Sequence, residues 1–298
     1  MLLRVNCSLV PASKKGPGKP CGRRSARTSM EPAPGAIGAG ESVTRREGID
    51  NRLLAMLPAA DFNLLMPDLE MVPLHQDQAL FHAGDEIEHV YFPHNGAVSL
   101  MIHMANGKSV ATAAIGREGA VGLLSVLGPS PSAITAVVHA AGVASRIPAL
   151  RFHAAFARSA AIRQVVQIHV RALLIQLQHG AACNALHPVE ARLARWLLHF
   201  RDCVDRDVLP LTQESLSEIL GVRRTTVTLL MRNLRACGAI RSDGRGRIEI
   251  DRARLAVAAC ECHETMRLGV EESFSLDPVE RRIQMHSGAV ARGTGGST

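Results

Sequence analysis

The chain has 298 residues, 47% of them hydrophobic, which is enough for about two globular domains with a sizeable core. No stretch of about 18 apolar residues is present to cross a bilayer, and the apolar run before Pro11 is too short for a secretory signal. The formal net charge of +7 does not by itself indicate a nucleic-acid partner, because residues 1–29 carry seven basic and no acidic residues and the rest of the chain sums to zero.

The first segment, residues 1–46, is rich in glycine, proline, serine and arginine and poor in apolar residues. This composition is typical of a disordered basic tail. Met30 is a candidate true start, which would make residues 1–29 a misassigned extension. At the other end of the chain, residues 274–298 are also expected to be an unstructured tail.

Residues 50–150 predict an antiparallel β-roll, because short apolar stretches alternate with glycine turns at a spacing of roughly ten residues. The clearest stretches are residues 90–92, 97–104 and 134–138. Asn95-Gly96 and Asn106-Gly107 are dipeptides typical of β-hairpins. Rolls of this kind often enclose a ligand, so we expect a sensory domain.

Residues 155–186 contain no proline and predict a long helix with one apolar stripe. The stripe consists of Ile162, Val165, Val166, Ala172, Leu173, Leu177 and Gly180. We expect it to pair with a second copy of the chain as a coiled coil, and packing against the chain's own roll is the alternative. His187-Pro188 should end this helix and act as a hinge.

A second amphipathic helix should follow Pro188, with Leu193, Trp196, Leu197 and Phe200 facing inward. After it, residues 211–234 have helix-turn-helix spacing. Leu216, Ile219 and Leu220 form the inner face of a first helix, Gly221 provides the tight turn, and Val222 enters the core. Val227, Leu230 and Leu234 are the buried stripe of a second helix.

The outward residues of that second helix suit double-stranded DNA. Arginine donates paired hydrogen bonds to guanine, and threonine offers a hydroxyl and a methyl to base edges. We therefore predict that Arg224, Thr225 and Thr228 read bases, while Arg223 and Thr226 contact phosphate near the start of the helix.

The segment after Leu234 predicts a wing, a two-stranded hairpin with Asp243-Gly244 at its turn and alternating Ile248 and Ile250. Residues 211–247 carry seven arginines and three acidic residues, a local surplus suited to a duplex backbone. Arg241 should lie beside the wing, and Arg245 and Arg247 should contact phosphate.

Taken together, the chain resembles the Crp/Fnr family of bacterial transcription regulators. The resemblance covers residues 50–262 and is carried by FHAGDEIEHVYFPHNGAVSL (81–100), GREGAVG (116–122) and LTQESLSEILGVRRTTVTLLMRNL (211–234). It implies an α+β fold in three parts: a cyclic-nucleotide-binding-like, jelly-roll-like β-roll over residues 50–150, a dimerisation helix over 155–186, and a winged helix-turn-helix over 187–262. A cytoplasmic homodimer is expected on a near-palindromic DNA site, with RNA polymerase as a further partner and no membrane contact.

The effector is not expected to be cyclic AMP. In the cyclic-nucleotide binders of this family, a glycine-glutamate pair holds the ribose and a later arginine pairs with the phosphate. Here the corresponding segment reads GLLSVLGPSPSAI, with Leu123 after Gly122 and Pro131 before Ser132-Ala133. Because neither leucine nor proline can neutralise a phosphate, residues 122–123 and 132–133 mark a candidate effector pocket of other specificity.

No metal or catalytic residue is predicted. Cys7 and Cys21 lie alone in the tail, so the four thiolates of an iron-sulfur cluster are missing. Cys260 and Cys262, followed by His263, lack the second ligand pair of a zinc site. Haem stays open as a cofactor because the roll contains several histidines, most of them expected at exposed positions: His75, His82, His89, His94 and His103.

Two other classes of function remain as alternatives, a metalloenzyme built on the roll and an interaction scaffold with a degenerate DNA reader. The sequence has no His-x-His pair, no phosphate-cradling glycine loop and no serine or cysteine nucleophile motif, so we predict that the chain is not an enzyme.

Overall fold

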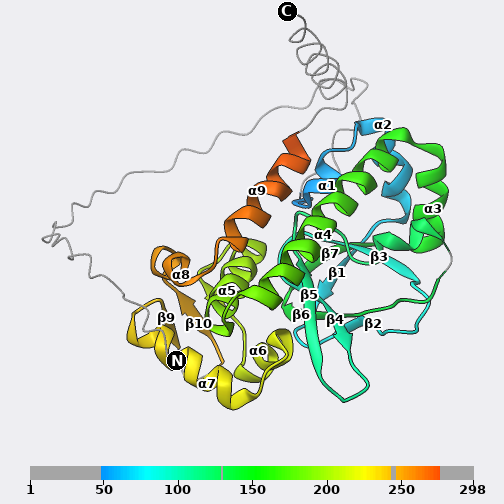
Figure 1. Ribbon diagram of the computed structural model, residues 1–298. Helices are drawn as coiled ribbons and strands as arrows, with labels where there is room; N and C mark the ends of the chain where they lie inside the picture. The colour runs from blue at the N-terminus through cyan, green and yellow to red at the C-terminus, as the bar shows by residue number, and fades with distance from the viewer. Residues whose placement is uncertain (1–47, 129, 243–245, 276–298) are drawn as a thin grey trace, which may run out of the picture. The chain divides into compact units, whose positions relative to one another are not determined.

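The computed structural model describes residues 48–128, 130–242 and 246–275 (Figure 1). The predictions for residues 1–46 and 276–298 lie outside this part of the chain. Within it, no helix is both long enough and apolar enough to span a membrane.

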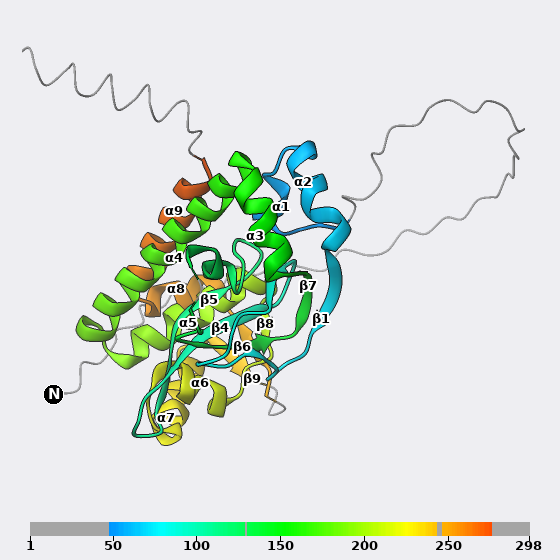
Figure 2. The ribbon, with the colours of Figure 1, turned by 90° about the vertical axis from the view of Figure 1, so that its right-hand side faces the viewer.

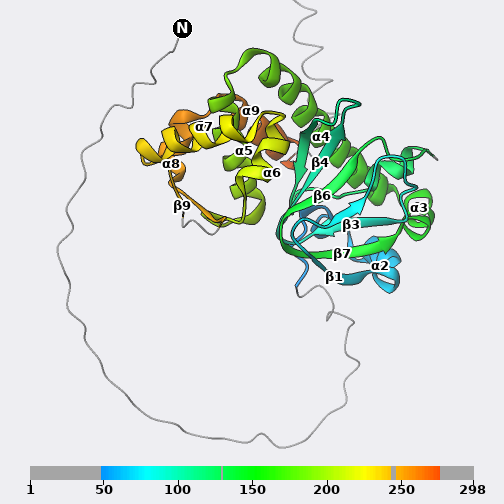
Figure 3. The same ribbon diagram turned by 90° about the horizontal axis from the view of Figure 1, so that it is seen from below.

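The N-terminal half is an antiparallel roll of two sheets, seen from below in Figure 3. One sheet has the order β1-β7-β3 and the other β2-β6-β4-β5. The strands are β1 (Glu70–Leu74), β2 (Ala79–Phe81), β3 (His89–Pro93), β4 (Ala97–His103), β5 (Ser109–Ile115), β6 (Thr135–Ala140) and β7 (Gly142–Pro148). Short helices precede and interrupt them: α1 (Arg52–Ala55), α2 (Ala59–Leu65), η1 (Met66–Asp68) and η2 (Leu123–Leu127).

The two predicted hairpin dipeptides behave differently. Asn106-Gly107 closes a hairpin, since β4 and β5 pair from His103 and Ser109 onward. Asn95-Gly96 instead joins β3 to β4, which belong to different sheets, so the prediction of a hairpin there was wrong. Gly96 has a φ of +83° and a Cβ would lie 2.7 Å from the carbonyl oxygen of Ala140, so this corner requires a glycine.

The long helix is interrupted at Ser159, so α3 (Ala149–Arg158) is separate from α4 (Ala160–Leu186). The Ser159 side chain accepts a hydrogen bond from the amide of Ile162, at 3.0 Å, and thereby caps α4. The single helix predicted from residue 155 therefore bends four residues after its expected start. His187 and Pro188 end α4 as predicted.

Most of the predicted dimerisation stripe of α4 packs inside its own chain. Ile162, Val165 and Val166 join a core with Phe92 and Phe152, and Leu173 joins the core between the two sheets. For these residues, the alternative that the helix packs against its own roll is therefore correct. A 3.6-residue period shows that a helix has a buried face, but both the roll and a partner helix can cover it.

The C-terminal part contains α5 (Val189–Val204), β8 (Val208–Leu209), α6 (Gln213–Leu220), α7 (Arg224–Ala236), β9 (Ile240–Ser242), β10 (Ile248–Ile250), α8 (Arg252–Ala258) and α9 (Cys262–Ser275). The four expected residues of α5 are buried in one core with Val227, Leu230 and Leu234 of α7. Val222 is only partly buried beside this core.

Helix α9 was not predicted, and it lies along α4 (Figures 1 and 2). Gly269 allows the close approach, because a Cβ there would lie 3.1 Å from the Ile175 side chain. Near its end, the Arg52 guanidinium stacks 4.0 Å above the Phe274 ring and forms an ion pair with Glu271. The unstructured tail was predicted to begin at residue 274, but residues 274 and 275 belong to α9.

Candidate nucleic-acid interface

The helix-turn-helix is built by local interactions in α6 and its turn. Thr212 and Ser215 form a reciprocal capping box at the start of α6. Gly221 ends the helix in the left-handed region, with φ +67° and ψ +31°, where a residue with a Cβ is strained. Leu216 and Ile219 are fully buried, so the predicted inner face is confirmed.

Helix α7 carries the predicted base-reading side chains on its surface. Arg224, Thr225 and Thr228 are exposed, while Thr226 is half-buried. Arg223 is the exposed residue that precedes the helix, in extended backbone conformation. The first amides of α7 are therefore close to the arginine predicted to contact phosphate.

Side-chain contacts link α7 to the start of α6. Thr228 Oγ1 donates to Gln213 Oε1 at 2.7 Å, and Arg224 lies 3.6 Å from the Glu214 carboxylate in an exposed ion pair. Exposed pairs of this kind contribute little to stability, so Arg224 can exchange Glu214 for another acceptor at small cost.

Two further residues of this surface were missed by the sequence analysis. Arg232 is exposed and lies four residues after Thr228, on the same face of α7 as Arg224 and Thr228. Gln213 reaches that face from α6. The i, i+4, i+8 spacing of 224, 228 and 232 was a signal that the prediction did not use.

The strands of the predicted wing pair as an antiparallel ladder, with Ile250 opposite Ile240 and Glu249 opposite Arg241. Arg241 and Arg247 are exposed. The turn itself, Asp243-Gly244 with Arg245, lies outside the described residues. Strand β8 adds a third strand to this sheet through β10.

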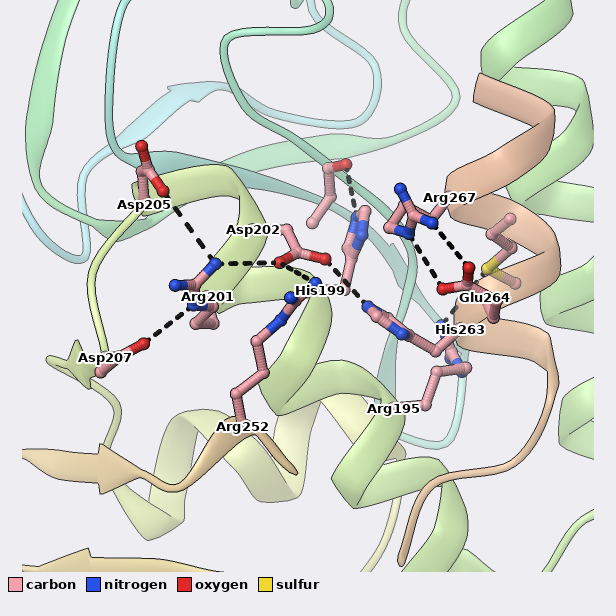
Figure 4. A network of polar contacts seen from close by, with 12 residues as sticks. Arg195, His199, Arg201, Asp202, Asp205, Asp207, Arg252, His263, Glu264 and Arg267 are labelled. Carbon is pink, nitrogen blue, oxygen red and sulfur yellow. Dashed lines mark hydrogen bonds and ion pairs between the residues drawn. The ribbon is translucent and has the colours of Figure 1, made fainter. Parts of the chain in front are cut away.

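A network of polar contacts fixes α5 against α8 and α9 (Figure 4). Asp202 lies at its centre, 2.9 Å from His263 Nε2 and 3.7 Å from Arg252. Burial alone would raise the pKa of Asp202, but the hydrogen bond from His263 and the nearby positive charges lower it. His199 of the same helix bonds the carbonyl oxygen of Ala114 in β5 at 3.0 Å. The network therefore orients the DNA-binding elements on the roll.

The predicted effector pocket coincides with a cavity of about 250 Å³ between the roll and α4. Gly122, Leu123, Ser132 and Ala133 all line it, so the structure brings the four predicted residues together. Among the described residues its lining contains no arginine, lysine, aspartate or glutamate. The Ser132 hydroxyl is already used, because it donates to the Ile134 carbonyl at 2.8 Å.

The titratable side chain in this cavity is His169 of α4, which the sequence analysis did not consider. Burial lowers the pKa of His169 to about 4, so its ring is neutral at pH 7. None of the five roll histidines named from the sequence lines this cavity. His94 differs from the expected exposed position: it is buried, and its Nδ1 accepts from the amides of Asp50 and Asn51.

A β-roll followed by a long helix and a winged helix-turn-helix defines a type of DNA-binding protein. The family comparisons agree with this architecture. Residues 71–159 match the cyclic nucleotide-binding domain, and residues 191–258 match the Crp-like helix-turn-helix domain. The chain belongs to the Crp/Fnr family of transcription regulators. No curated protein matches it at a significant level.

Solved structures of low sequence identity share the fold. FixK2 from Bradyrhizobium japonicum superposes with a TM-score of 0.55 at 17% identity, covering 64% of this chain and 98% of FixK2. The c-di-GMP-responsive regulator CLP from Xanthomonas campestris has a TM-score of 0.54 at 16% identity, covering 65% and 99%. A Crp/Fnr-family regulator from Eubacterium rectale has a TM-score of 0.54 at 17% identity, and the match covers 70% of this chain and 97% of that regulator. The predicted α+β fold class is confirmed.

Proposed function

We propose that this protein is a sequence-specific transcription regulator that binds double-stranded DNA as a homodimer, and that it is not an enzyme. The proposal rests on the exposed face of α7. Arg224, Thr225 and Thr228 are exposed on this face, while the opposite face of the helix packs into the helix-turn-helix core. These side chains offer donors to purine edges and methyl groups to thymine in a major groove. We also propose that the protein acts in the cytoplasm and that its partners there are DNA and RNA polymerase.

The phosphate contacts proposed for Arg223, Thr226 and the wing arginines would flank the base-reading residues. Arg223 and Thr226 lie at the start of α7, where the helix presents its unpaired amides. Arg247 directly precedes strand β10 of the wing. The phosphate contact proposed for Arg245 rests on the sequence prediction alone. Contacts on both sides of the recognition helix fix its register on the duplex.

The dimer interface that we propose lies on a stripe of α4 that shares only Leu177 with the one predicted. Val170, Leu174, Leu177 and Ala181 recur at steps of four, three and four residues, which is the spacing of a coiled-coil seam. Leu174 is 49% exposed and Leu177 is 36% exposed, although both are leucines of a central helix. A groove of about 500 Å³ beside them is lined by Leu127, Val170 and Leu174. A second copy of α4 would cover these side chains.

A two-fold dimer places two copies of α7 on one side of the duplex. Their half-sites are then about 34 Å apart, one helical turn, on a near-palindromic sequence.

The effector that we propose is a small molecule without a phosphate, and not cyclic AMP. A phosphate buried in the roll cavity would have no cationic partner among the described lining residues, and an unpaired buried charge is costly. The same argument applies to the dinucleotide named for CLP. The apolar walls with neutral His169 suit a mainly apolar ligand with one or two hydrogen-bonding groups.

The experiment that tests the DNA-binding proposal is selection of bound duplexes from a random double-stranded library with the full chain. A selected motif with two inverted half-sites, bound by a species of twice the chain mass in native mass spectrometry, is the expected result. Binding without any enriched motif, or no salt-sensitive binding to duplex, would instead favour an interaction scaffold.

The effector proposal has its own test in calorimetric titration of the purified chain with cyclic AMP and with cyclic di-GMP. No heat of specific binding is expected from either nucleotide. Saturable micromolar binding of either one would contradict the assignment of the cavity.

A further inference from the structure

Four side chains with soft or imidazole ligand atoms meet at the end of α4. Cys183 and His187 come from the last turn of that helix and its C-cap, and Cys260 and Cys262 come from the junction between α8 and α9. One ligand atom of each lies within 4.8 Å of all the others. Cys183 and Cys262 are buried, and His187 and Cys260 are half-buried.

Two of the six separations among the ligand atoms match the edges of a tetrahedral metal site. With metal-sulfur bonds of about 2.3 Å and metal-nitrogen bonds of about 2.0 Å, the edges of the tetrahedron are about 3.5–3.8 Å long. Cys183 Sγ lies 3.5 Å from Cys260 Sγ, and Cys262 Sγ lies 3.5 Å from His187 Nδ1. The sulfur atoms are too far apart for a disulfide, whose bond is about 2.05 Å long.

The second nitrogen of His187 supports the same arrangement. His187 Nε2 lies 3.2 Å from a carboxylate oxygen of Glu261, while Nδ1 faces the thiols. Metal-binding histidines commonly donate their other ring N–H to a carboxylate, which fixes the tautomer and makes the free nitrogen a better ligand. Glu261 lies between the two cysteines in sequence, so the same short segment supplies two ligands and their orienting group.

The charge around the cluster is a further, independent observation. Arg195 of α5 is 97% buried, its Nε has no hydrogen-bond partner, and it forms no ion pair with a carboxylate among the residues that the structure describes. A buried guanidinium needs an anion nearby. Three thiolates, one neutral imidazole and a divalent cation carry a net charge of −1. Arg195 lies beside the cluster, because its guanidinium contacts Met266 Sδ at 3.7 Å and Met266 packs with Cys183 and Cys262.

We propose that Cys183, His187, Cys260 and Cys262 form a Cys₃His site for a zinc-class divalent cation, which joins the end of the central helix to the segment that follows the winged domain. Thiolate and imidazole ligands in a closed four-coordinate set favour Zn²⁺. Binding displaces the thiol protons into solvent, so no oxidant or reductant is needed.

From the sequence, no metal was predicted here, because Cys260 and Cys262 lacked a second pair of ligands. The fold supplies that pair from 77 residues earlier in the chain. His263, which is adjacent in sequence, is not part of the cluster, because its Nε2 bonds to Asp202.

The position of the site suggests what the ion does. His187 is also the first residue of the break between α4 and α5, where the hinge was expected. An ion held by residues on both sides of the winged domain would restrict rotation of that domain about the break. Metal binding would therefore stabilise one orientation of the DNA-binding elements, whether or not DNA is present.

The test uses the full chain purified under reducing conditions without chelator. Elemental analysis should find one zinc per chain, and replacement by Co²⁺ should give the visible d–d absorption of a tetrahedral ion and a thiolate-to-cobalt charge-transfer band. Chelation should lower the melting temperature. A chain that retains no metal and shows no charge-transfer band with Co²⁺ would overturn the proposal.

Variants then assign the ligands. Cys183→Ser and Cys262→Ser should lower zinc affinity at least 100-fold, and Glu261→Gln, which leaves all four ligands, about 10-fold. Matched controls are Cys237→Ser, whose thiol bonds only the Leu234 carbonyl among its described contacts, and His263→Gln. Equal zinc content in the ligand variants and the controls would show that the metal is bound elsewhere, for example by Cys7 and Cys21.

Discussion

The hydroxyl of Thr228 donates a hydrogen bond to Oε1 of Gln213, at 2.7 Å, and this bond connects the recognition helix to the start of the helix before it. The carbonyl oxygen of Arg224, one turn earlier and 3.0 Å away, is a second acceptor for the same hydroxyl proton. Gln213 provides the shorter of the two contacts and links the threonine hydroxyl to α6.

We expect Gln213→Ala to weaken discrimination at the base pair next to Thr228 by about 1 kcal/mol, because a side-chain hydrogen bond of this kind is worth about that much. Quantitative gel shifts on single-base variants of the selected site would measure it. Glu272→Ala, a change at an exposed position on α9, is the control. An equal loss on all DNA sequences would mean that Gln213 contributes only to general affinity.

Arg224 and Arg247 should differ in the kind of affinity they provide. Arg224→Ala should cost about 1–3 kcal/mol at one base pair and relax the preference there, because Arg224 is placed to contact a base edge. Arg247→Ala should weaken all sequences alike and reduce the salt dependence by about one ion. Binding isotherms at several salt concentrations would distinguish the two. The same salt slopes and base preferences in both variants would refute this division.

Leu174→Glu should convert the dimer to a monomer. A carboxylate in an apolar helix seam faces its own copy across the two-fold axis, and both the desolvation and the repulsion are unfavourable. Leu150→Glu is the matched control, since Leu150 is 81% exposed on α3 and away from the seam. Analytical ultracentrifugation would follow both variants. A dimer that persists in Leu174→Glu would place the interface elsewhere.

Stability should fall as the pH drops from 7 to 5, because burial lowers the pKa of four histidines, His94, His139, His169 and His199. Burial lowers the pKa of both His139 and His169 to about 4. Between about pH 6.5 and 4 the unfolded chain binds these protons and the folded chain does not, so the free energy of unfolding decreases with falling pH. Each histidine accounts for about 2 kcal/mol over this interval.

Denaturant unfolding at several pH values would measure that slope, and His139→Phe tests the share of one residue. His139 packs edge-on against Phe200, with the ring centroids 6.2 Å apart, so an aromatic replacement preserves the contact. The variant should lose less stability between pH 7 and 5 than the parent chain. An unchanged slope would mean that His139 is protonated in the folded protein.

The sequence alone determined the DNA-binding half of the molecule. Leu216, Gly221 and Val227 could be placed correctly because helix periodicity and the left-handed turn are set by residues only a few positions apart. The two strands of the wing follow from the same local rules, whereas the register that pairs Ile240 with Ile250 was not predicted. Four of the residues that line the roll cavity were also named from the sequence, through the family pattern that they interrupt.

Only the tertiary structure decided which stripe of α4 is covered by the roll and which is left exposed. Ile162 and Leu174 are both apolar, and the difference between them is the roll that packs on one side. Likewise, nothing near Cys260 in sequence indicates Cys183, because their contact depends on α9 lying along α4. Local patterns report the conformation of a segment, whereas its neighbours are set by long-range packing that no single segment encodes.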